Sequence, residues 1–230
     1  MPVFWLTDKN MAFPNPELAN EEGILAVGGD LSPQRLLYAY SIGIFPWFNP
    51  EDPIIWWSPD PRFVLFPEEL KISKSMRPLF NQQKFEVSMD RAFPEVIASC
   101  ASVARRGQGG GTWISKAMQE AYIRLHELGF AHSVEVWQEG QLVGGLYGIA
   151  LGKCFFGESM FAKVSNASKY GFISLVRHLH EEGYWLVDCQ QETAHLASLG
   201  ARSIPRKEFL GILHDNQKED THQGPWEDLL

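Results

Sequence analysis

Two short stretches of this chain combine side chains that could act on a small substrate. Gly157-Glu158-Ser159-Met160-Phe161 sets a carboxylate among apolar residues, and further along Asp188-Cys189-Gln190 supplies a second carboxylate and an amide. Both stretches are expected at strand ends, on either side of a helix that opens at Asn166-Ala167-Ser168-Lys169. A few polar groups aimed into an apolar pocket are typical of sites where small substrates are held and reacted.

Each of these polar residues also has an ordinary explanation. Glu158 and Asp188 could cap helices, and Gln190 could be a solvated turn residue. For any one of them that explanation would be preferred, but three at the edge of one sheet favour a site. Asp188 and Gln190 are also two residues apart, so on a regular strand their side chains would share one face.

The elements that must position these residues follow an α+β order. Hydrophobic spacing and turn residues predict a helix from residue 115, strands over 133–138, 142–151 and 154–158, a helix over 167–182 and a strand over 184–190. A short helix ending at Gly200 and another starting near Pro205 should follow. An antiparallel meander followed by helix, strand and helix resembles the acetyltransferase-like (GNAT-like) fold.

The first part of the chain is expected to form a small separate domain. A short strand over 24–29 precedes a helix that starts at Ser32-Pro33 and ends near Ile42. Two aromatic, proline-broken stretches then follow, residues 43–50 and 54–62, and we expect neither to be regular. A chain of 230 residues suits one large or two unequal domains. We therefore predict domains over 1–61 and 62–214, followed by a tail over 215–230.

The net charge of −8 argues against a general nucleic-acid binder, but the charge is unevenly distributed. Acidic residues dominate positions 215–230, which we expect to be disordered. Basic residues dominate positions 71–116. That segment could hold a phosphate backbone locally, although a solvated surface without a partner is the commoner explanation.

Cysteine usage and the chain's start predict a cytoplasmic protein. Cys100, Cys154 and Cys189 form no CxxC pair and are most simply buried thiols in a reducing compartment. The first residues lack the basic region and long apolar core of a signal peptide, and no apolar run approaches a membrane span. No metal-ligand spacing and no nucleophile–histidine pattern is found, so we expect no metal.

Five blocks in order resemble the leucyl/phenylalanyl-tRNA–protein transferase family. They are Gly43-Ile44-Phe45-Pro46-Trp47-Phe48, Trp56-Trp57-Ser58-Pro59-Asp60-Pro61-Arg62, Gly111-Thr112-Trp113-Ile114, Gly157-Glu158-Ser159-Met160-Phe161 and Asp188-Cys189-Gln190. Any one block would be weak, whereas five in order over residues 13–214 are specific. The resemblance implies a small N-terminal domain joined to a GNAT-like C-terminal domain.

The resemblance also implies an activity. Members move leucine or phenylalanine, and less well methionine, from aminoacyl-tRNA to the N-terminus of proteins that begin with Arg or Lys, which marks those proteins for degradation through the N-degron pathway. The reaction uses no ATP, metal or coenzyme, so we expect no cofactor, and a monomer is the simplest assumption. The donor is an activated ester, and the acceptor α-amine, with an ordinary pKa of about 7.7–8.0, is partly unprotonated at neutral pH. Positioning alone can therefore carry much of the reaction.

Similarity to the family assigns roles to individual residues. Asp188, Gln190 and Glu158 fall at the catalytic positions. We expect Asp188 to attract the cationic acceptor N-terminus, with activation of the amine through Gln190 as the alternative role. Glu158 would be a second negative group for the acceptor or for the donor's amino group.

Other family positions concern the donor. The pocket for its side chain corresponds to Leu146, Phe155, Met160, Phe172, Leu175, Leu179 and Val187. Trp47 and Trp113 match the residues that sandwich the terminal adenosine. The acceptor-stem phosphates would be held by Lys71, Lys74, Arg77 and Lys84.

Two other functions remain open. A coenzyme-A-dependent N-acetyltransferase on the same fold would need an Arg/Gln-x-x-Gly-x-Gly/Ala loop, but the corresponding residues 163–171 lack those glycines. A non-catalytic RNA-binding protein is the other possibility, and the pocket carboxylates argue against it.

Overall fold

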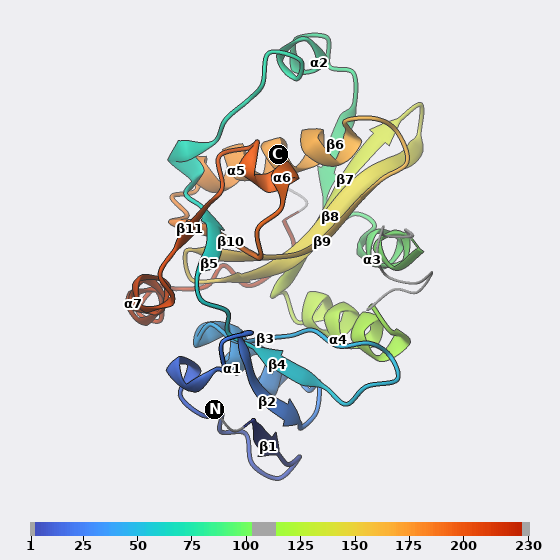
Figure 1. Cartoon of the computed structure of the whole chain (residues 1–230). Coiled ribbons are helices and arrows are strands. Elements are labelled where there is room, and N and C mark those ends of the chain that lie inside the picture. Colours follow the sequence, from blue (N-terminus) through green and yellow to red (C-terminus); the bar gives the residue numbers. More distant parts are fainter. Residues whose placement is uncertain (1–2, 103–113, 227–230) are drawn as a thin grey trace.

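Two β-sheets organise the chain in the computed structural model, which describes residues 3–102 and 114–226. The smaller sheet has four strands in the order β1-β2-β4-β3 and forms the lower part of the molecule in Figure 1. Its strands are β1 (Phe4–Leu6), β2 (Ile24–Gly28), β3 (Phe45–Pro46) and β4 (Ile55–Trp57). The short helix η1 (Pro16–Leu18) precedes β2, and α1 (Pro33–Ser41) follows it.

The larger sheet has seven strands in the order β11-β5-β10-β9-β8-β7-β6. Its strands are β5 (Arg62–Leu65), β6 (Glu86–Met89), β7 (Ala131–Gln138), β8 (Gln141–Leu151), β9 (Cys154–Ala162), β10 (Leu186–Gln190) and β11 (Arg202–Ile204). All neighbouring strands in it are antiparallel except β9 and β10. The predicted boundary at residue 61 lies where the chain passes from one sheet to the other.

Helices cover both faces of the larger sheet, as Figure 1 shows. The helices after β5 are η2 (Pro67–Glu69), α2 (Arg77–Asn81), α3 (Phe93–Ser102), α4 (Lys116–Glu127), α5 (Ala167–Glu181), α6 (Ala194–Ala197) and α7 (Arg206–Asn216), and α5 lies on one face of the sheet with α3 and α4 on the other. Side chains alternate along each strand between two cores. Phe155 and Val187 belong to the core under α5, whereas Phe156 and Leu186 belong to the core shared by α3, α4 and the smaller sheet.

The α+β class predicted from the sequence is confirmed, and β7, β8, β10 and α5 lie close to where they were expected. The expectation that Glu158 ends its strand is wrong, because β9 continues past it to Ala162. The prediction of irregular structure over 43–50 and 54–62 is wrong, because those stretches contain β3 and β4 as well as the first residue of β5. Pro46 is compatible with its strand because β3 lies at the edge of the sheet. Strands this short, of two and three residues, carry no readable alternation.

Residues 215–226 are packed against the protein, so the prediction that they are disordered is wrong. Asn216 is buried and donates its Nδ2 to the Leu151 carbonyl at 2.8 Å. Trp226 is only 1% exposed. The acidic composition of the segment concealed these two anchors, which an average over composition cannot reveal. Residues 227–230 of the predicted tail lie outside the described part of the chain.

The parallel pair of β9 and β10 prepares the place where the site forms. Their pairing runs from Leu186 opposite Cys154 to Asp188 opposite Phe156. A β-bulge then shifts the register of β10 between Asp188 and Gln190, and Gln190 has a φ of +64°. Bulges bend strands and re-aim side chains. The residues that come next on both strands, Gly157 on β9 and Cys189 on β10, line a cavity.

Candidate active site

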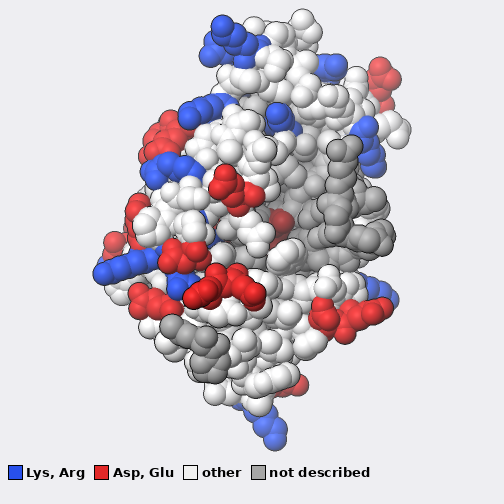
Figure 2. Space-filling model, in the orientation of Figure 1, with Lys and Arg blue, Asp and Glu red and all other residues white. Residues whose placement is uncertain are grey.

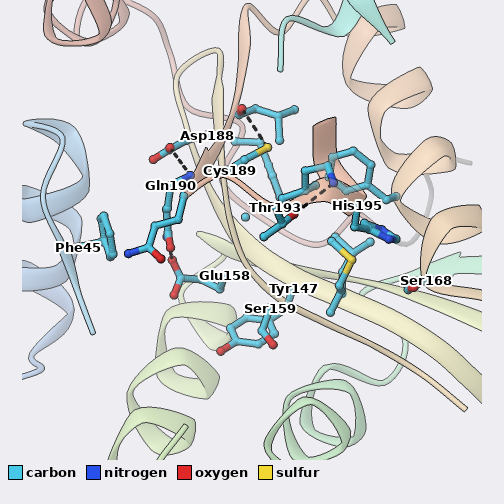
Figure 3. A pocket seen from close by; sticks show the side chains of 18 of the residues that line it. Phe45, Tyr147, Glu158, Ser159, Ser168, Asp188, Cys189, Gln190, Thr193 and His195 are labelled. Carbon is cyan, nitrogen blue, oxygen red and sulfur yellow. Dashed lines mark hydrogen bonds between the residues drawn. The ribbon is translucent and has the colours of Figure 1, made fainter. Parts of the chain in front are cut away.

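A cavity of about 450 Å³ opens where β9 and β10 separate, and it is bordered by β8, α5, α6 and the segment after β3. Figure 3 shows Glu158 and Gln190 on one side of it, with Thr193, His195 and Ser168 on the other. The cavity's exposed wall is mostly apolar, and its polar groups come from the middle of β9, the end of β10 and the residues around α5 and α6. This composition suits a small ligand held by its apolar part and oriented by a few hydrogen bonds.

Most residues predicted to hold the donor side chain line this cavity. The structure brings together Leu146, Phe155, Met160, Phe172 and Val187. Leu175 and Leu179 do not line it and are fully buried in the core under α5. They follow Phe172 on the same face of α5, and that face continues along the sheet beyond the end of the cavity. Helical spacing predicted the shared face correctly but could not show where the cavity stops.

Glu158 lies at the polar end of the cavity and is only 9% exposed. Its carboxylate accepts hydrogen bonds from the Tyr40 hydroxyl at 2.6 Å, the Tyr122 hydroxyl at 3.0 Å and the Gln190 Nε2 at 2.7 Å. The two tyrosine hydroxyl oxygens also lie within hydrogen-bond distance of each other, so each hydroxyl proton can serve either Glu158 or the other tyrosine, but only one of them at a time. Three elements far apart in the sequence, α1, α4 and β10, therefore hold one carboxylate.

Burial raises the pKa of Glu158 to about 7. The hydrogen bonds from Tyr40, Tyr122 and Gln190 oppose this rise, and the nearby Asp188 carboxylate adds to it. Burial and the charge of Glu158 also raise the pKa of both tyrosines well above its ordinary value, so both hydroxyls remain donors. Glu158 is thus a carboxylate that changes protonation near neutral pH, a property often found at functional sites.

Gln190 reaches the site through the bulge in β10. Its backbone N–H donates to Asp188 Oδ1 at 2.9 Å, as Figure 3 shows, and its side-chain Nε2 donates to Glu158. With Nε2 fixed in this way, the amide Oε1 is directed away from Glu158. The side chain of Gln190 thereby presents an oriented acceptor beside the apolar wall of the cavity.

Asp188 borders the cavity, but its carboxylate has a different role from the one expected. It is fully buried and forms a bidentate pair with Arg62, Nε to Oδ1 at 2.8 Å and Nη2 to Oδ2 at 2.6 Å. Arg62 is buried between the rings of Phe45 and Phe209, 4.7 and 4.6 Å from their centroids. This pairing argues against the expectation that Asp188 attracts a cationic N-terminus, because its charge is already compensated and removed from solvent.

Four residues of the site were missed by sequence reasoning. Tyr40 and Tyr122 were not among the predicted site residues, although a buried tyrosine hydroxyl usually requires a hydrogen-bond partner. Arg62 was read as the end of an irregular segment. His195 lies on α6 and borders the cavity, and burial, together with the Lys169 charge, lowers its pKa. Its place after an N-capping threonine gave no signal of a cavity.

The predicted tryptophan pair can be described for one member only. Trp47 lines the cavity mouth and is partly exposed, and its carbonyl accepts a hydrogen bond from the Trp57 indole at 2.6 Å. The two indole rings lie 5.5 Å apart. Trp113 lies outside the described residues. Trp47 is thus an aromatic surface at the entrance, fixed from behind by Trp57.

The basic residues predicted to contact phosphates are all exposed. Lys71, Lys74, Arg77 and Lys84 lie before, on and after α2. Figure 2 shows Lys and Arg gathered over the end of the molecule that carries α2, while Asp and Glu are more frequent over its middle. None of the four lines the cavity. The structure therefore separates a basic surface from the apolar site.

Metal chemistry finds no support within residues 3–102 and 114–226. No group of three or more His, Cys, Asp or Glu side chains there is arranged to hold a metal ion. Cys189 borders the cavity, but burial raises the pKa of its thiol, so it remains protonated. No helix in the same described part of the chain is both long and apolar enough to cross a bilayer.

Comparison with known proteins decides the family. The family model described as leucyl/phenylalanyl-tRNA protein transferase matches residues 64–214, and the model of that family's N-terminal domain matches residues 29–60. The chain belongs to this family. Several proteins named leucyl/phenylalanyl-tRNA–protein transferase are more than half identical to this chain. The one from Syntrophobacter fumaroxidans is 56% identical over 99% of this chain and 96% of its own length, and that from Nitrosospira multiformis is 58% identical over 89% and 88%.

Two solved structures with a similar fold are only distantly related to this chain. L-PGS from Bacillus licheniformis is 11% identical with a TM-score of 0.40, over 74% of this chain and 53% of that one. An aminoglycoside acetyltransferase from a soil metagenome is 12% identical with a TM-score of 0.38, over 60% of this chain and 89% of that one. Likeness at this level carries no argument about substrates.

Proposed function

We propose that this chain transfers leucine or phenylalanine, and less well methionine, from aminoacyl-tRNA to the N-terminal α-amine of proteins that begin with Arg or Lys. Membership of the transferase family supports the reaction class. The observation that carries the site assignment is the apolar cavity whose polar end holds Gln190 against a buried Glu158. The apolar wall suits an uncharged donor side chain, and the oriented amide suits an incoming amine.

The transfer forms one bond and breaks one. The acceptor amine attacks the ester carbonyl carbon, a C–N bond forms, and the C–O bond to the tRNA ribose breaks. The amine loses a proton and the ribose oxygen gains one. Gln190 Oε1 accepts a hydrogen bond from the attacking amine and aims its lone pair at the ester, while Glu158 holds the Gln190 amide in place. Placement of this kind can lower the barrier by about 7–11 kcal/mol.

The donor's amino acid occupies the apolar wall. Leu146, Phe155, Met160, Phe172 and Val187 would contact its side chain. Each buried methylene contributes about 0.8 kcal/mol, so larger apolar side chains are favoured over small ones. Charged side chains would lose their hydration without gaining a partner on this wall.

The rest of the donor would follow the surface outward. Trp47 at the cavity mouth stacks on the terminal adenine, with Trp113, which lies outside the described residues, as the proposed second ring. Lys71, Lys74, Arg77 and Lys84 hold phosphates of the acceptor stem. The protein acts as a monomer in the cytoplasm, uses no cofactor, and its products enter N-degron degradation.

The two alternatives have less support. An acetyltransferase would need glycines to cradle a pyrophosphate at the start of α5, and the residue before that helix is Asn166 in a left-handed conformation with a φ of +68°. A non-catalytic RNA-binding protein would have no use for a buried carboxylate whose pKa is raised to about 7.

A transfer assay tests the proposal. The protein is incubated with Leu-tRNA or Phe-tRNA and with peptides that start with Arg, Lys or Ala, and the products are weighed by mass spectrometry. The expected result is a gain of one leucine or phenylalanine on the Arg and Lys peptides and none on the Ala peptide. Gln190→Ala should abolish most of the transfer, whereas Gln141→Ala, at an exposed strand end, should not. Transfer of acetyl groups from acetyl-coenzyme A instead would overturn the assignment.

A further inference from the structure

The segment after α7 is tied along the end of the larger sheet. Asn216 Oδ1 accepts from the Lys153 N–H at 2.6 Å, and Thr221 Oγ1 accepts from the Gly152 N–H at 2.8 Å. Gln223 Nε2 donates to the Leu128 carbonyl at 2.8 Å. These contacts reach both the β8–β9 turn and the connection between α4 and β7, so the segment runs from one of these connections to the other.

Trp226 anchors the end of this segment inside the protein. Its backbone N–H donates to Asp90 Oδ2 at 2.8 Å, and the same carboxylate oxygen lies 2.8 Å from His132 Nδ1. The Trp226 indole stacks on the His132 ring, with centroids 3.9 Å apart and planes 7° from parallel. The backbone of Trp226 is therefore fixed by a buried hydrogen bond, and its indole is fixed by an aromatic stack.

One ring separates Trp226 from the cavity. Phe155 lines the cavity, and its ring centroid lies 6.0 Å from that of Trp226. Phe155 also packs closely on the neighbouring strand β8, where a Cβ added to Gly148 would come within 2.6 Å of its ring. The Phe155 ring is thus confined between Gly148 and Trp226. The position of this part of the cavity wall depends on both.

We propose that Trp226 is a positioning residue that sets the depth of the donor side-chain pocket by supporting Phe155. Because pocket depth decides between a branched aliphatic and an aromatic donor, Trp226 determines the preference between leucine and phenylalanine. This inference rests on the proposed function of the cavity. It also gives the acidic C-terminal segment a role, namely to deliver one indole behind the wall.

The physical reason lies in close packing. Removing a large buried side chain leaves a space that neighbouring groups fill only in part. Without Trp226, the Phe155 ring can retreat from the cavity, which deepens the pocket. A leucine side chain would then lose contacts, while a phenylalanine side chain would keep them.

Binding of two stable donor analogues tests the proposal without requiring transfer. The probes are adenosine carrying leucine or phenylalanine through a 3′-amide bond, and the measured quantity is the ratio of their Kd values by calorimetry. Trp226→Ala should shift this ratio by about tenfold toward phenylalanine, the low end of what one methylene contributes in an apolar pocket. Trp226→Phe, which keeps a ring, should shift it in the same direction but less.

Two controls separate support from general destabilisation. In a Phe155→Ala background, Trp226→Ala should leave the ratio unchanged, because the ring through which it acts is gone. Trp56→Phe, at a fully buried tryptophan of the smaller sheet, should lower stability without changing the ratio. An unchanged ratio in both Trp226 variants, or an equal shift with and without Phe155, would overturn the proposal. Altered binding ratios in a protein that transfers neither amino acid would overturn the proposed function and keep the role of Trp226.

Discussion

Two carboxylates at the polar end of the cavity have opposite surroundings. Asp188 is fully buried and paired in bidentate fashion with the guanidinium of Arg62. Glu158 is almost as deeply buried, but its described hydrogen-bond donors are neutral, two tyrosine hydroxyls and one amide. The two groups lie close enough for the charge of Asp188 to raise the pKa of Glu158.

The difference shows how one fold can assign separate tasks to similar groups. A buried charge with an opposite charge at hydrogen-bond distance fixes backbone geometry, and here Asp188 holds the bulge through the Gln190 N–H. A buried carboxylate with only neutral donors stays titratable near neutral pH. We therefore assign Asp188 and Arg62 to the architecture of the site and Glu158 to the orientation of Gln190.

Breaking the ion pair should have the largest effect. Asp188→Asn or Arg62→Met leaves the partner's charge buried without compensation, which should lower the free energy of unfolding by about 3–5 kcal/mol. Denaturant titration measures this change. The double variant Arg62→Met with Asp188→Leu should recover part of the loss, because neither charge remains. If each single variant unfolds like the parent protein, the architectural role is refuted.

The pH dependence of stability should distinguish Glu158 from ordinary carboxylates. Its pKa is about 7 in the folded protein and 4.5 as an unperturbed group, so between these values the folded state binds the extra proton. The free energy of unfolding should therefore fall as the pH rises through this range. The expected loss is about 3 kcal/mol, because each pKa unit of difference corresponds to about 1.36 kcal/mol. In Glu158→Gln, this contribution to the pH dependence of the free energy of unfolding should vanish.

A second buried carboxylate provides the matched control. Burial also raises the pKa of Glu135, which is bound by Ser88 and Ser133 away from the cavity. Glu135→Gln should change the pH dependence of stability but not that of transfer. Loss of transfer in both variants would mean that Glu158 acts through general stability.

Removing one tyrosine hydroxyl should change the pKa of Glu158 while leaving its carboxyl group in place. A hydrogen bond to a charged group contributes about 1.5–3 kcal/mol, so Tyr122→Phe should raise the pKa of Glu158 by about one to two units. The pH–rate profile of transfer should move upward by the same amount, as measured in single-turnover reactions. An unshifted profile with a lower rate would indicate that Tyr122 only supports packing.

The exposed basic residues differ from the buried carboxylates because water and salt screen their charges. If Lys74, Arg77 and Lys84 hold tRNA phosphates, each substitution to Ala should make the log–log salt dependence of tRNA binding shallower by about 0.7–0.9. Stability should change little. Lys207→Ala, at an exposed position on α7, serves as the control and should leave the slope unchanged. Equal slopes for all four variants would place the tRNA elsewhere.

The sequence predicted the pieces of the site better than their connections. Hydrophobic spacing located β8, β9 and α5, and motif resemblance pointed to Glu158 and Gln190. Partners of the site residues come from distant parts of the chain, Tyr40 of α1 for Glu158 and Arg62 of β5 for Asp188. No local pattern records such contacts. The buried state of Asp188 and the bulge beside it depend in the same way on strand order. Trp226 was missed because one buried residue hardly changes the composition of an acidic segment.

Direct titration of Glu158 tests the central claim that a proton-exchanging carboxylate orients Gln190. The side-chain carboxyl of glutamate is labelled with ¹³C, the Glu158 signal is assigned by its absence in Glu158→Gln, and its chemical shift is followed against pH. We predict a midpoint at about 7. A midpoint near the ordinary value for glutamate, about 4.3, would contradict the account, because the carboxylate would then be fixed in one form throughout the range in which the acceptor amine reacts.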